Sequence, residues 1–186
     1  MRILGGEDSS RLIKVPKIEG IRPTNNRARK ALFDILQQEI TGIDVLDLFS
    51  GSGAIGLEAI SRGASSVCFA EKEEACLDVI YENIRQLGYD NKTCVLRGDV
   101  FKALKHLDKE KRKFDIIVMD PPYRSGLAKK ALLKISTYDI IKPSTLIVVE
   151  HNRNEDLPPL LGNLRAYKKS FYGDTALSFY KIEGLK

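Results

Sequence analysis

The residues best suited to chemistry stand together in Asp120-Pro121-Pro122-Tyr123, directly after the apolar run "IIVM". Proline has a fixed φ and no backbone N–H, so two prolines in succession make a stiff loop with unmatched carbonyl groups. The Asp120 carboxylate adds more hydrogen-bond acceptors, and Tyr123 places an aromatic ring beside them. Acceptors next to such a ring can bind the amino group of a stacked base.

An amino group of this kind is a poor nucleophile, because its lone pair is delocalised into the base. Acceptors on Asp120 and on the Pro121 carbonyl can hold both N–H bonds, so that the lone pair points at an incoming methyl group. Positioning supplies much of the rate, and the acceptors stabilise the positive charge that grows on nitrogen. The sequence therefore predicts amino-group methylation, with catalytic residues Asp120, Pro121, Pro122 and Tyr123. A rigid turn with an ordinary half-buried tyrosine is the alternative.

A glycine loop precedes this tetrapeptide, because Gly51-Ser52-Gly53-Ala54-Ile55-Gly56 lies between an apolar run and a helical pattern. Glu71 follows twenty positions after Gly51, and by pattern alone this spacing allows a nicotinamide dinucleotide. A pyrophosphate would bind at the helix N-terminus, where Asp47 would repel it. S-adenosylmethionine carries an ammonium and a sulfonium group and no phosphate. A nearby carboxylate therefore favours S-adenosylmethionine over NAD.

The acids that follow the next two strand patterns suit the same cofactor. Glu71 can bind the ribose hydroxyls, and Asp99 can bind the adenine amino group, although either acid could instead cap a helix. No metal is expected, because the two histidines and three scattered cysteines show no ligand spacing. The expected cofactor contacts are Asp47, Phe49, Gly51, Gly53, Glu71, Lys72, Asp99 and Val100.

Strand and helix patterns alternate through most of the chain, which is typical of a parallel sheet covered on both faces. "RAYKKSFYG" and "ALSFYKIE" then predict an antiparallel pair at the sheet edge. Ligands of such sheets bind at the carboxyl ends of the strands. Five acids stand there in the predicted arrangement: Asp47, Glu71, Asp99, Asp120 and Glu150. Strands are expected at "IDVLDLF", "SVCFAE", "TCVLRG", "FDIIVMD" and "TLIVVEH", and helices from Gly53 and over 73–87, 100–107 and 127–136.

The N-terminal residues 1–40 do not follow this alternation of strands and helices, and they are basic. "RIL" and "RLIKV" predict a hairpin around "GGEDSS", and Thr24 can cap a helix over 25–39. The net charge of +5 hints at an anionic partner. A solvated helix face is the alternative. The candidate nucleic-acid contacts are Arg22, Arg27, Arg29, Lys30 and, after Tyr123, Arg124.

In combination, "GIRPTNNRARKALFDIL", "DLFSGSGAIGLEAISRGA" and "VMDPPY" resemble class I S-adenosylmethionine-dependent methyltransferases. The closer resemblance is to the RsmD-type family of bacterial small-subunit ribosomal RNA guanine-N2 methyltransferases, and it covers nearly the whole chain. It implies an α/β, Rossmann-like fold with a seven-stranded, mostly parallel sheet and an antiparallel C-terminal strand pair. It also implies methylation of one guanine N2 of 16S ribosomal RNA, within the small subunit or its assembly intermediate.

On this interpretation, residues 1–40 form an RNA-contacting hairpin and helix, and residues 41–186 form the catalytic domain. We expect a cytoplasmic protein, because no apolar run is long enough to span a membrane and no signal-peptide core is present. We also expect a monomer, because nothing in the sequence demands a dimer. A DNA amino-methyltransferase (adenine N6 or cytosine N4) is less favoured, because such enzymes usually have a separate recognition domain. The sequence also leaves open a protein-glutamine methyltransferase, a NAD-dependent oxidoreductase and a non-catalytic RNA-binding module.

Overall fold

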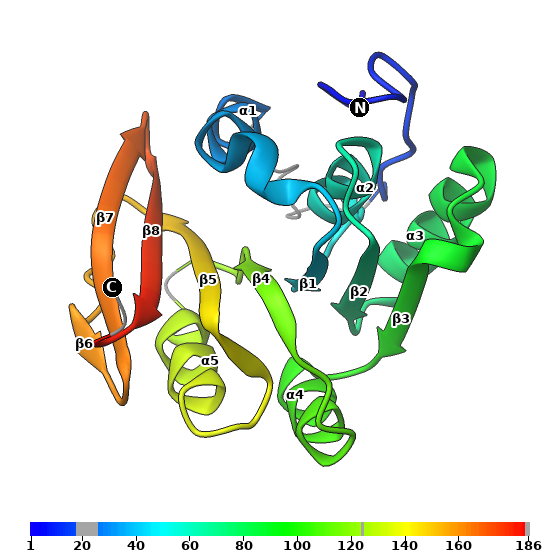
Figure 1. Ribbon diagram of the computed structural model, residues 1–186. Helices are drawn as coiled ribbons and strands as arrows, with labels where there is room; N and C mark the ends of the chain where they lie inside the picture. Colours follow the sequence, from blue (N-terminus) through cyan, green and yellow to red (C-terminus); the bar gives the residue numbers. More distant parts are fainter. Residues whose placement is uncertain (18–25, 124, 185–186) are drawn as a thin grey trace.

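One mixed sheet runs through the molecule (Figure 1). The computed structural model describes residues 1–17, 26–123 and 125–184, and in this part of the chain the sheet has eight strands in the order β3-β2-β1-β4-β5-β8-β7-β6. The first five strands are parallel, and β8, β7 and β6 join antiparallel. Their bounds are β1 (Asp44–Leu48), β2 (Ser66–Glu71), β3 (Thr93–Arg97), β4 (Phe114–Met119), β5 (Ile141–Asn152), β6 (Leu160–Leu161), β7 (Leu164–Tyr172) and β8 (Thr175–Ile182).

The expected total of seven strands is corrected to eight. The additional strand, β6, has two residues and pairs with the start of β7. It escapes the sequence pattern because two residues are too few to show a period-two alternation. The parallel strands and the antiparallel C-terminal pair are confirmed.

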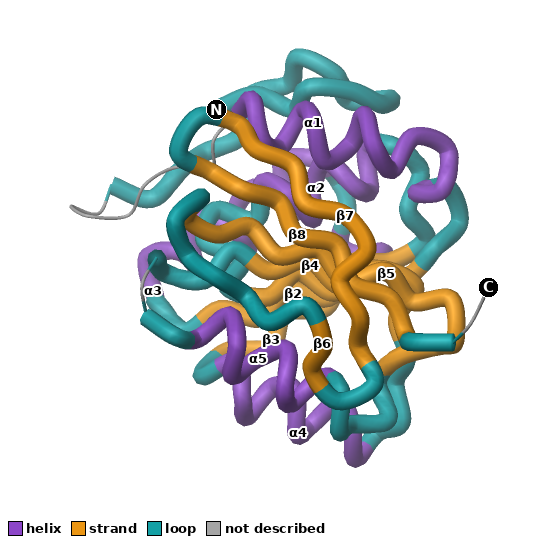
Figure 2. Tube along the Cα trace, turned by 90° about the vertical axis from the view of Figure 1, so that its left-hand side faces the viewer, coloured by secondary structure: helices purple, strands orange, loops and turns teal. Residues whose placement is uncertain are grey.

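Helices cover both faces of the sheet (Figure 2). Helices α1–α3 share a hydrophobic core with one face, and α4 and α5 share a second core with the other. In β1, Val45 belongs to the first core, and Leu46 and Leu48 to the second, as expected where successive side chains alternate. The helices are α1 (Asn26–Leu36), α2 (Ala54–Ser61), α3 (Glu74–Leu87), α4 (Val100–Lys109) and α5 (Leu127–Ile135), with short 3-10 helices η1 (Gln37–Ile40) and η2 (Asp90–Lys92).

The first helix ends earlier than expected. Gln37 has a positive φ of 43°, a conformation that interrupts a right-handed helix, and the chain continues as η1. Thr24, the expected cap, lies outside the described residues. No helix in the described ranges is long and apolar enough to cross a membrane.

The N-terminal arm, residues 1–17, forms a short antiparallel pairing where the hairpin was expected, and no regular strand. One bridge joins Arg2 to Leu12, with the Ile3 N–H donating to the Arg11 carbonyl at 3.0 Å and the Ile13 N–H to the Met1 carbonyl at 2.9 Å. Residues between Arg2 and Leu12 bond to α2 instead: Leu4 N–H donates to the Glu58 carboxylate, and Asp8 N–H donates to the Ser61 hydroxyl. Backbone donors satisfied by α2 are not available for a β-ladder. Ile3 and Ile13 are buried in the same core as α1 and α2.

Candidate active site

The glycine loop connects β1 to α2 in a left-handed backbone conformation. Gly51 has φ of 55° and Gly53, which caps α2, has φ of 74°; glycine adopts such angles without steric cost. Gly56 is needed for a different reason. A Cβ at this position would lie 2.3 Å from the Phe69 ring, so only glycine lets α2 approach β2 this closely. Phe49, half-buried at the start of the loop, also has a positive φ, of 59°.

Glu71, at the end of β2, holds this loop in place. One carboxylate oxygen accepts the Gly51 N–H at 2.8 Å. The other accepts the N–H groups of Lys72 at 2.7 Å and Glu73 at 2.9 Å. An ionised carboxylate has about four acceptor positions, so three bonds leave little freedom for the side chain. Lys72 itself is exposed, with its ammonium group 3.3 Å from the Glu73 carboxylate.

Asp47, on β1, binds the first turn of α2. Its Oδ2 accepts the Gly56 N–H at 3.0 Å, and its side chain is buried. Burial raises the pKa of Asp47 well above its usual range; the Gly56 bond opposes this shift, and the carboxylates of Asp120 and Glu71 add to it.

The Gly51 amide in the loop and the Gly56 amide in the first turn of α2 therefore already donate to carboxylates. A pyrophosphate at a helix N-terminus needs such amides free and avoids negative charge. The geometry thus disfavours a dinucleotide and favours a cationic ligand near the loop. The sequence suggested repulsion by Asp47, but not that the amides themselves are occupied.

Asp99 lies at the N-terminus of α4 and caps it, accepting the Phe101 N–H at 2.9 Å. This is the alternative use that the sequence allowed. Its side chain is exposed, and Val100, the first residue of α4, is buried. The Gly98 N–H donates to the Glu71 carbonyl at 2.7 Å, which brings the ends of β2 and β3 together. An adenine contact by Asp99 stays a prediction.

Asp120 follows β4 at the carboxyl edge of the sheet. Its N–H donates to the Leu48 carbonyl of β1 at 3.4 Å. Burial of its carboxyl group raises the pKa of Asp120 to about 7. Pro121 is buried and Pro122 is exposed, with the Pro122 carbonyl accepting the Ser125 hydroxyl at 2.5 Å. The tetrapeptide therefore presents a carboxyl group poised between its two protonation states at neutral pH.

Glu150 is brought to this site from β5. The pairing of Met119 with Val149 places Glu150 beside Asp120, on the same face of the sheet as Asp47. The Glu150 side chain is buried, and burial raises its pKa to about 9, with a further rise from Asp120 and an opposing hydrogen bond from Tyr123.

The Tyr123 hydroxyl also lies 3.2 Å from the Thr175 Oγ1 at the start of β8. The tyrosine is thus held by β5 and β8 together. Sequence reasoning placed Glu150 at a strand end but did not link it to Tyr123, and it missed Thr175. The signal for Glu150 was its position at the end of the strand that follows the Asp120 strand.

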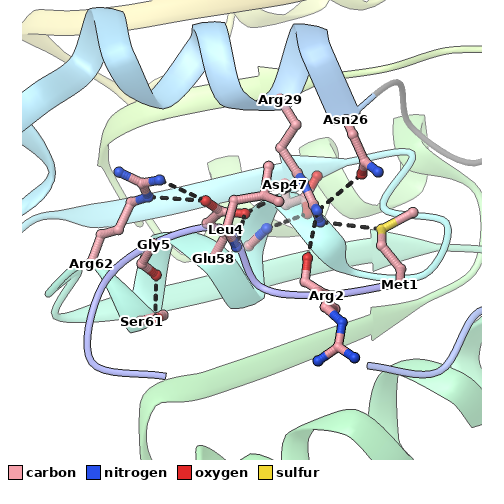
Figure 3. A network of polar contacts seen from close by, with 11 residues as sticks. Met1, Arg2, Leu4, Gly5, Asn26, Arg29, Asp47, Glu58, Ser61 and Arg62 are labelled. Carbon is pink, nitrogen blue, oxygen red and sulfur yellow. Dashed lines mark hydrogen bonds and ion pairs between the residues drawn. The ribbon is translucent and has the colours of Figure 1, made fainter. Parts of the chain in front are cut away.

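The expectation that Arg29 contacts nucleic acid is corrected, because its side chain is buried and surrounded by polar partners (Figure 3). Its guanidinium donates to the Arg2 carbonyl at 2.6 Å and lies 3.4 Å from the Glu58 carboxylate. Arg29 shares the helix face of Leu32 and Leu36 at spacings of three and seven residues, and that spacing indicated the buried face. Arg27 and Lys30 are exposed on α1. Arg22 and Arg124 lie outside the described residues.

Comparison with known proteins identifies the family. The chain matches the family described as "Conserved hypothetical protein 95" over residues 1–181. It is 31% identical over 183 residues to ribosomal RNA small subunit methyltransferase D of Escherichia coli K12, covering 98% of this chain and 90% of that protein. The chain belongs to the RsmD-type family.

Two further comparisons also cover nearly the whole chain. YlbH of Bacillus subtilis strain 168 is 32% identical over 184 residues, which span 99% of this chain and 100% of that protein. The solved structure of yhhF from Escherichia coli has a TM-score of 0.85 and 30% identity, and 98% of each chain is covered. The chain is thus a class I S-adenosylmethionine-dependent methyltransferase, as its motifs predicted.

Proposed function

We propose that this RsmD-type protein methylates the exocyclic N2 amino group of a guanine in 16S ribosomal RNA, within the small subunit or an assembly intermediate. The observation that carries the proposal is the position of Asp120-Pro121-Pro122-Tyr123 at the carboxyl edge of the sheet, adjacent to the acids around the glycine loop. The name of the Escherichia coli relative, a small-subunit ribosomal RNA methyltransferase, supports the choice of RNA.

The residues around the glycine loop fit S-adenosylmethionine. Asp47, Glu71 and Asp120 lie close enough for their charges to interact, and such a set attracts a sulfonium or ammonium group. Space is open at Gly51, where an added Cβ would meet no atom within 4 Å. The candidate contacts are Asp47, Phe49, Gly51, Gly53, Glu71, Lys72, Asp99 and Val100. When bound, S-adenosylmethionine supplies an electrophilic methyl group.

Asp120 and the Pro121 carbonyl bind the guanine amino group in this proposal. An ionised Asp120 accepts one N–H, and the proline carbonyl accepts the other, which aims the nitrogen lone pair away from both acceptors. The growing positive charge on nitrogen is then stabilised by groups that are already in position. A pKa of about 7 also allows Asp120 to take up the proton that the methylated nitrogen releases.

Tyr123 is proposed to stack on the guanine. Its hydroxyl is fixed by Glu150 and Thr175, so the ring presents one defined face to the base. A fixed platform lowers the entropy lost when the base binds. Arg27 and Lys30 are proposed as phosphate contacts on the exposed face of α1, and residues 1–40 as an RNA-contacting unit of a monomeric enzyme.

The experiment is methyl transfer from labelled S-adenosylmethionine to small ribosomal subunits from a strain that lacks this gene, compared with duplex DNA. The labelled nucleoside is then identified by mass. N2-methylguanosine from the subunits is the expected product. Label in N6-methyladenine or N4-methylcytosine of DNA alone would overturn the RNA substrate while keeping the amino-methylation chemistry.

A further inference from the structure

The turn between β7 and β8 lies at the same edge of the sheet as the proposed catalytic residues. β5 runs parallel to β4, and its last residue, Asn152, pairs with Thr175 at the start of β8. Tyr123 contacts Thr175 directly, at 3.2 Å between their oxygens. The start of β8 therefore lies beside Tyr123, and the end of β7 pairs with it at this edge of the sheet (Figure 1, orange to red). Tyr172 shares the face of Thr175, and Phe171 projects from the other face at the same edge, so a strand of RNA that crosses this edge can reach both Tyr123 and Phe171.

An aromatic ring flanked by two cations stands on this hairpin. Phe171, near the end of β7, is 52% exposed. The Arg153 guanidinium carbon lies 5.5 Å from the centre of its ring, and the Lys169 ammonium nitrogen lies 5.3 Å from it. Arg153 is fixed to the turn, since its backbone N–H donates to the Asp174 carbonyl at 2.8 Å and its Nη1 donates to the Gly173 carbonyl at 3.2 Å. We call these three residues, Arg153, Lys169 and Phe171, the Phe171 cluster.

The charge of the cluster is not neutralised by ion pairs. None of the ion pairs among the described residues involves Arg153 or Lys169. From Leu164 to Ile182 the chain has four basic side chains and one acidic side chain, Asp174 in the turn. An isolated exposed phenylalanine would need no explanation, but a ring between two unpaired cations has the composition of a single-stranded nucleic-acid site.

We propose that the Phe171 cluster binds single-stranded RNA beside the target guanine. A neighbouring base stacks on Phe171, and Arg153 and Lys169 bind the flanking phosphates. The inference rests on the proposed function and extends it to the part of the substrate around the methylated nucleotide. A guanine whose amino group reaches Asp120 must leave any stack or pair it occupies, so its neighbours are unstacked bases that can use an aromatic platform.

The test measures binding of a short fluorescein-labelled oligouridine to the full chain over a range of salt concentrations. Phe171→Ala is expected to lower affinity about 5- to 100-fold, the equivalent of losing one stacked base. Arg153→Gln with Lys169→Gln is expected to reduce the slope of log affinity against log salt by about 1.4, since each phosphate contact on a single strand contributes about 0.7.

Matched controls come from the other end of β7 and from β6, which pairs with it there. Leu160 is an exposed apolar residue on β6, and Arg165 is an exposed cation on β7. Leu160→Ala and Arg165→Gln are expected to bind oligouridine like the wild type. Binding of S-adenosylhomocysteine by every variant checks that each one is folded.

Oligouridine contains no guanine, so this binding does not depend on methyl transfer. Equal oligouridine affinity of Phe171→Ala and the wild type would overturn the inference, as would a wild type that does not bind oligouridine. If Phe171→Ala binds oligouridine more weakly but the wild type does not methylate small subunits, the RNA surface is supported and only the proposed function is overturned. Reduced binding with a raised KM for small subunits supports both.

Discussion

The Arg29 guanidinium lies 3.4 Å from the Glu58 carboxylate, and both side chains are fully shielded from solvent. Glu58 is also bound by Arg62 at 2.8 Å, and Arg29 by the Arg2 carbonyl at 2.6 Å (Figure 3). Helix α1, helix α2 and the N-terminal arm therefore meet at one buried ion-pair network. The network joins the N-terminal arm and α1 to the glycine-loop helix, and Ile3 and Ile13 of the arm lie in the same core.

Removal of Arg29 is expected to destabilise the fold. Arg29→Ala should lower the free energy of unfolding by about 3 kcal/mol, because the buried Glu58 carboxylate loses one of its two partners. The loss is at the lower end of the usual range because Arg62 remains paired with Glu58. Urea denaturation followed by circular dichroism measures it. Lys30→Ala, on the exposed face of the same helix, is the control and should change stability by less than about 0.5 kcal/mol. Equal losses in the two variants would contradict the structural role of Arg29.

Glu71→Gln is expected to weaken cofactor binding. An amide at this position replaces one acceptor oxygen with a donor, which faces the N–H groups of Gly51, Lys72 or Glu73. The loss of one charge-assisted bond corresponds to roughly 10- to 100-fold in affinity. Calorimetric titration with S-adenosylhomocysteine measures it. Glu74→Gln is the control, since Glu74 is exposed and paired with Arg97; an unchanged affinity in Glu71→Gln would refute the loop-ordering role.

The pH dependence of turnover is expected to follow Asp120. Its pKa is raised to about 7 by burial, and only the ionised form can take up the proton that the methylated nitrogen releases. kcat/KM should therefore rise about tenfold per pH unit below about 7 and level off above it. In Asp120→Asn, kcat/KM should no longer rise with pH below about 7, and kcat should fall by about 100-fold or more. The affinity of this variant for S-adenosylhomocysteine should stay within a few-fold of wild type. A pH profile that persists in Asp120→Asn would assign the titration to another group.

The stability of the protein is expected to fall with rising pH because of Glu150. Its pKa is raised from 4.5 to about 9, first by burial and then by Asp120. Since the folded state holds the proton that the unfolded state has released, the stabilisation is complete below about 4.5 and is lost as pH rises toward 9. The slope from this group is about 1.4 kcal/mol per pH unit.

Glu150→Gln should remove that part of the slope, and urea midpoints between pH 5 and about 9 measure it. Glu155→Gln, a nearby position on the chain, should keep the wild-type slope. Glu150→Gln also retains hydrogen-bonding groups for the Tyr123 hydroxyl, so its turnover should exceed that of Glu150→Ala. Identical slopes in the wild type and Glu150→Gln would show that Glu150 is ionised in the folded state.

The sequence by itself determined the fold class and the place of the candidate acids at one edge of the sheet. Alternating strand and helix patterns predict a parallel sheet, and the rule that ligands bind at strand ends assembles Asp47, Glu71 and Asp120 at one edge without any tertiary information. The glycine loop and the Asp120-Pro121-Pro122-Tyr123 segment can be interpreted from the sequence alone, because the backbone freedom of glycine and the missing N–H of proline are properties of single residues.

Only the tertiary structure decided which partners these side chains have. Arg29 is basic and near other basic residues in the sequence, yet its partners come from distant segments. One partner is the carbonyl of Arg2, 27 positions earlier, and the other is the carboxylate of Glu58 on helix α2. Glu71 is bound by the amide of Gly51, and Tyr123 by Glu150 and Thr175 from strands that follow it. Long-range hydrogen bonds depend on how distant segments pack, and no local pattern of residue types records which distant groups become partners.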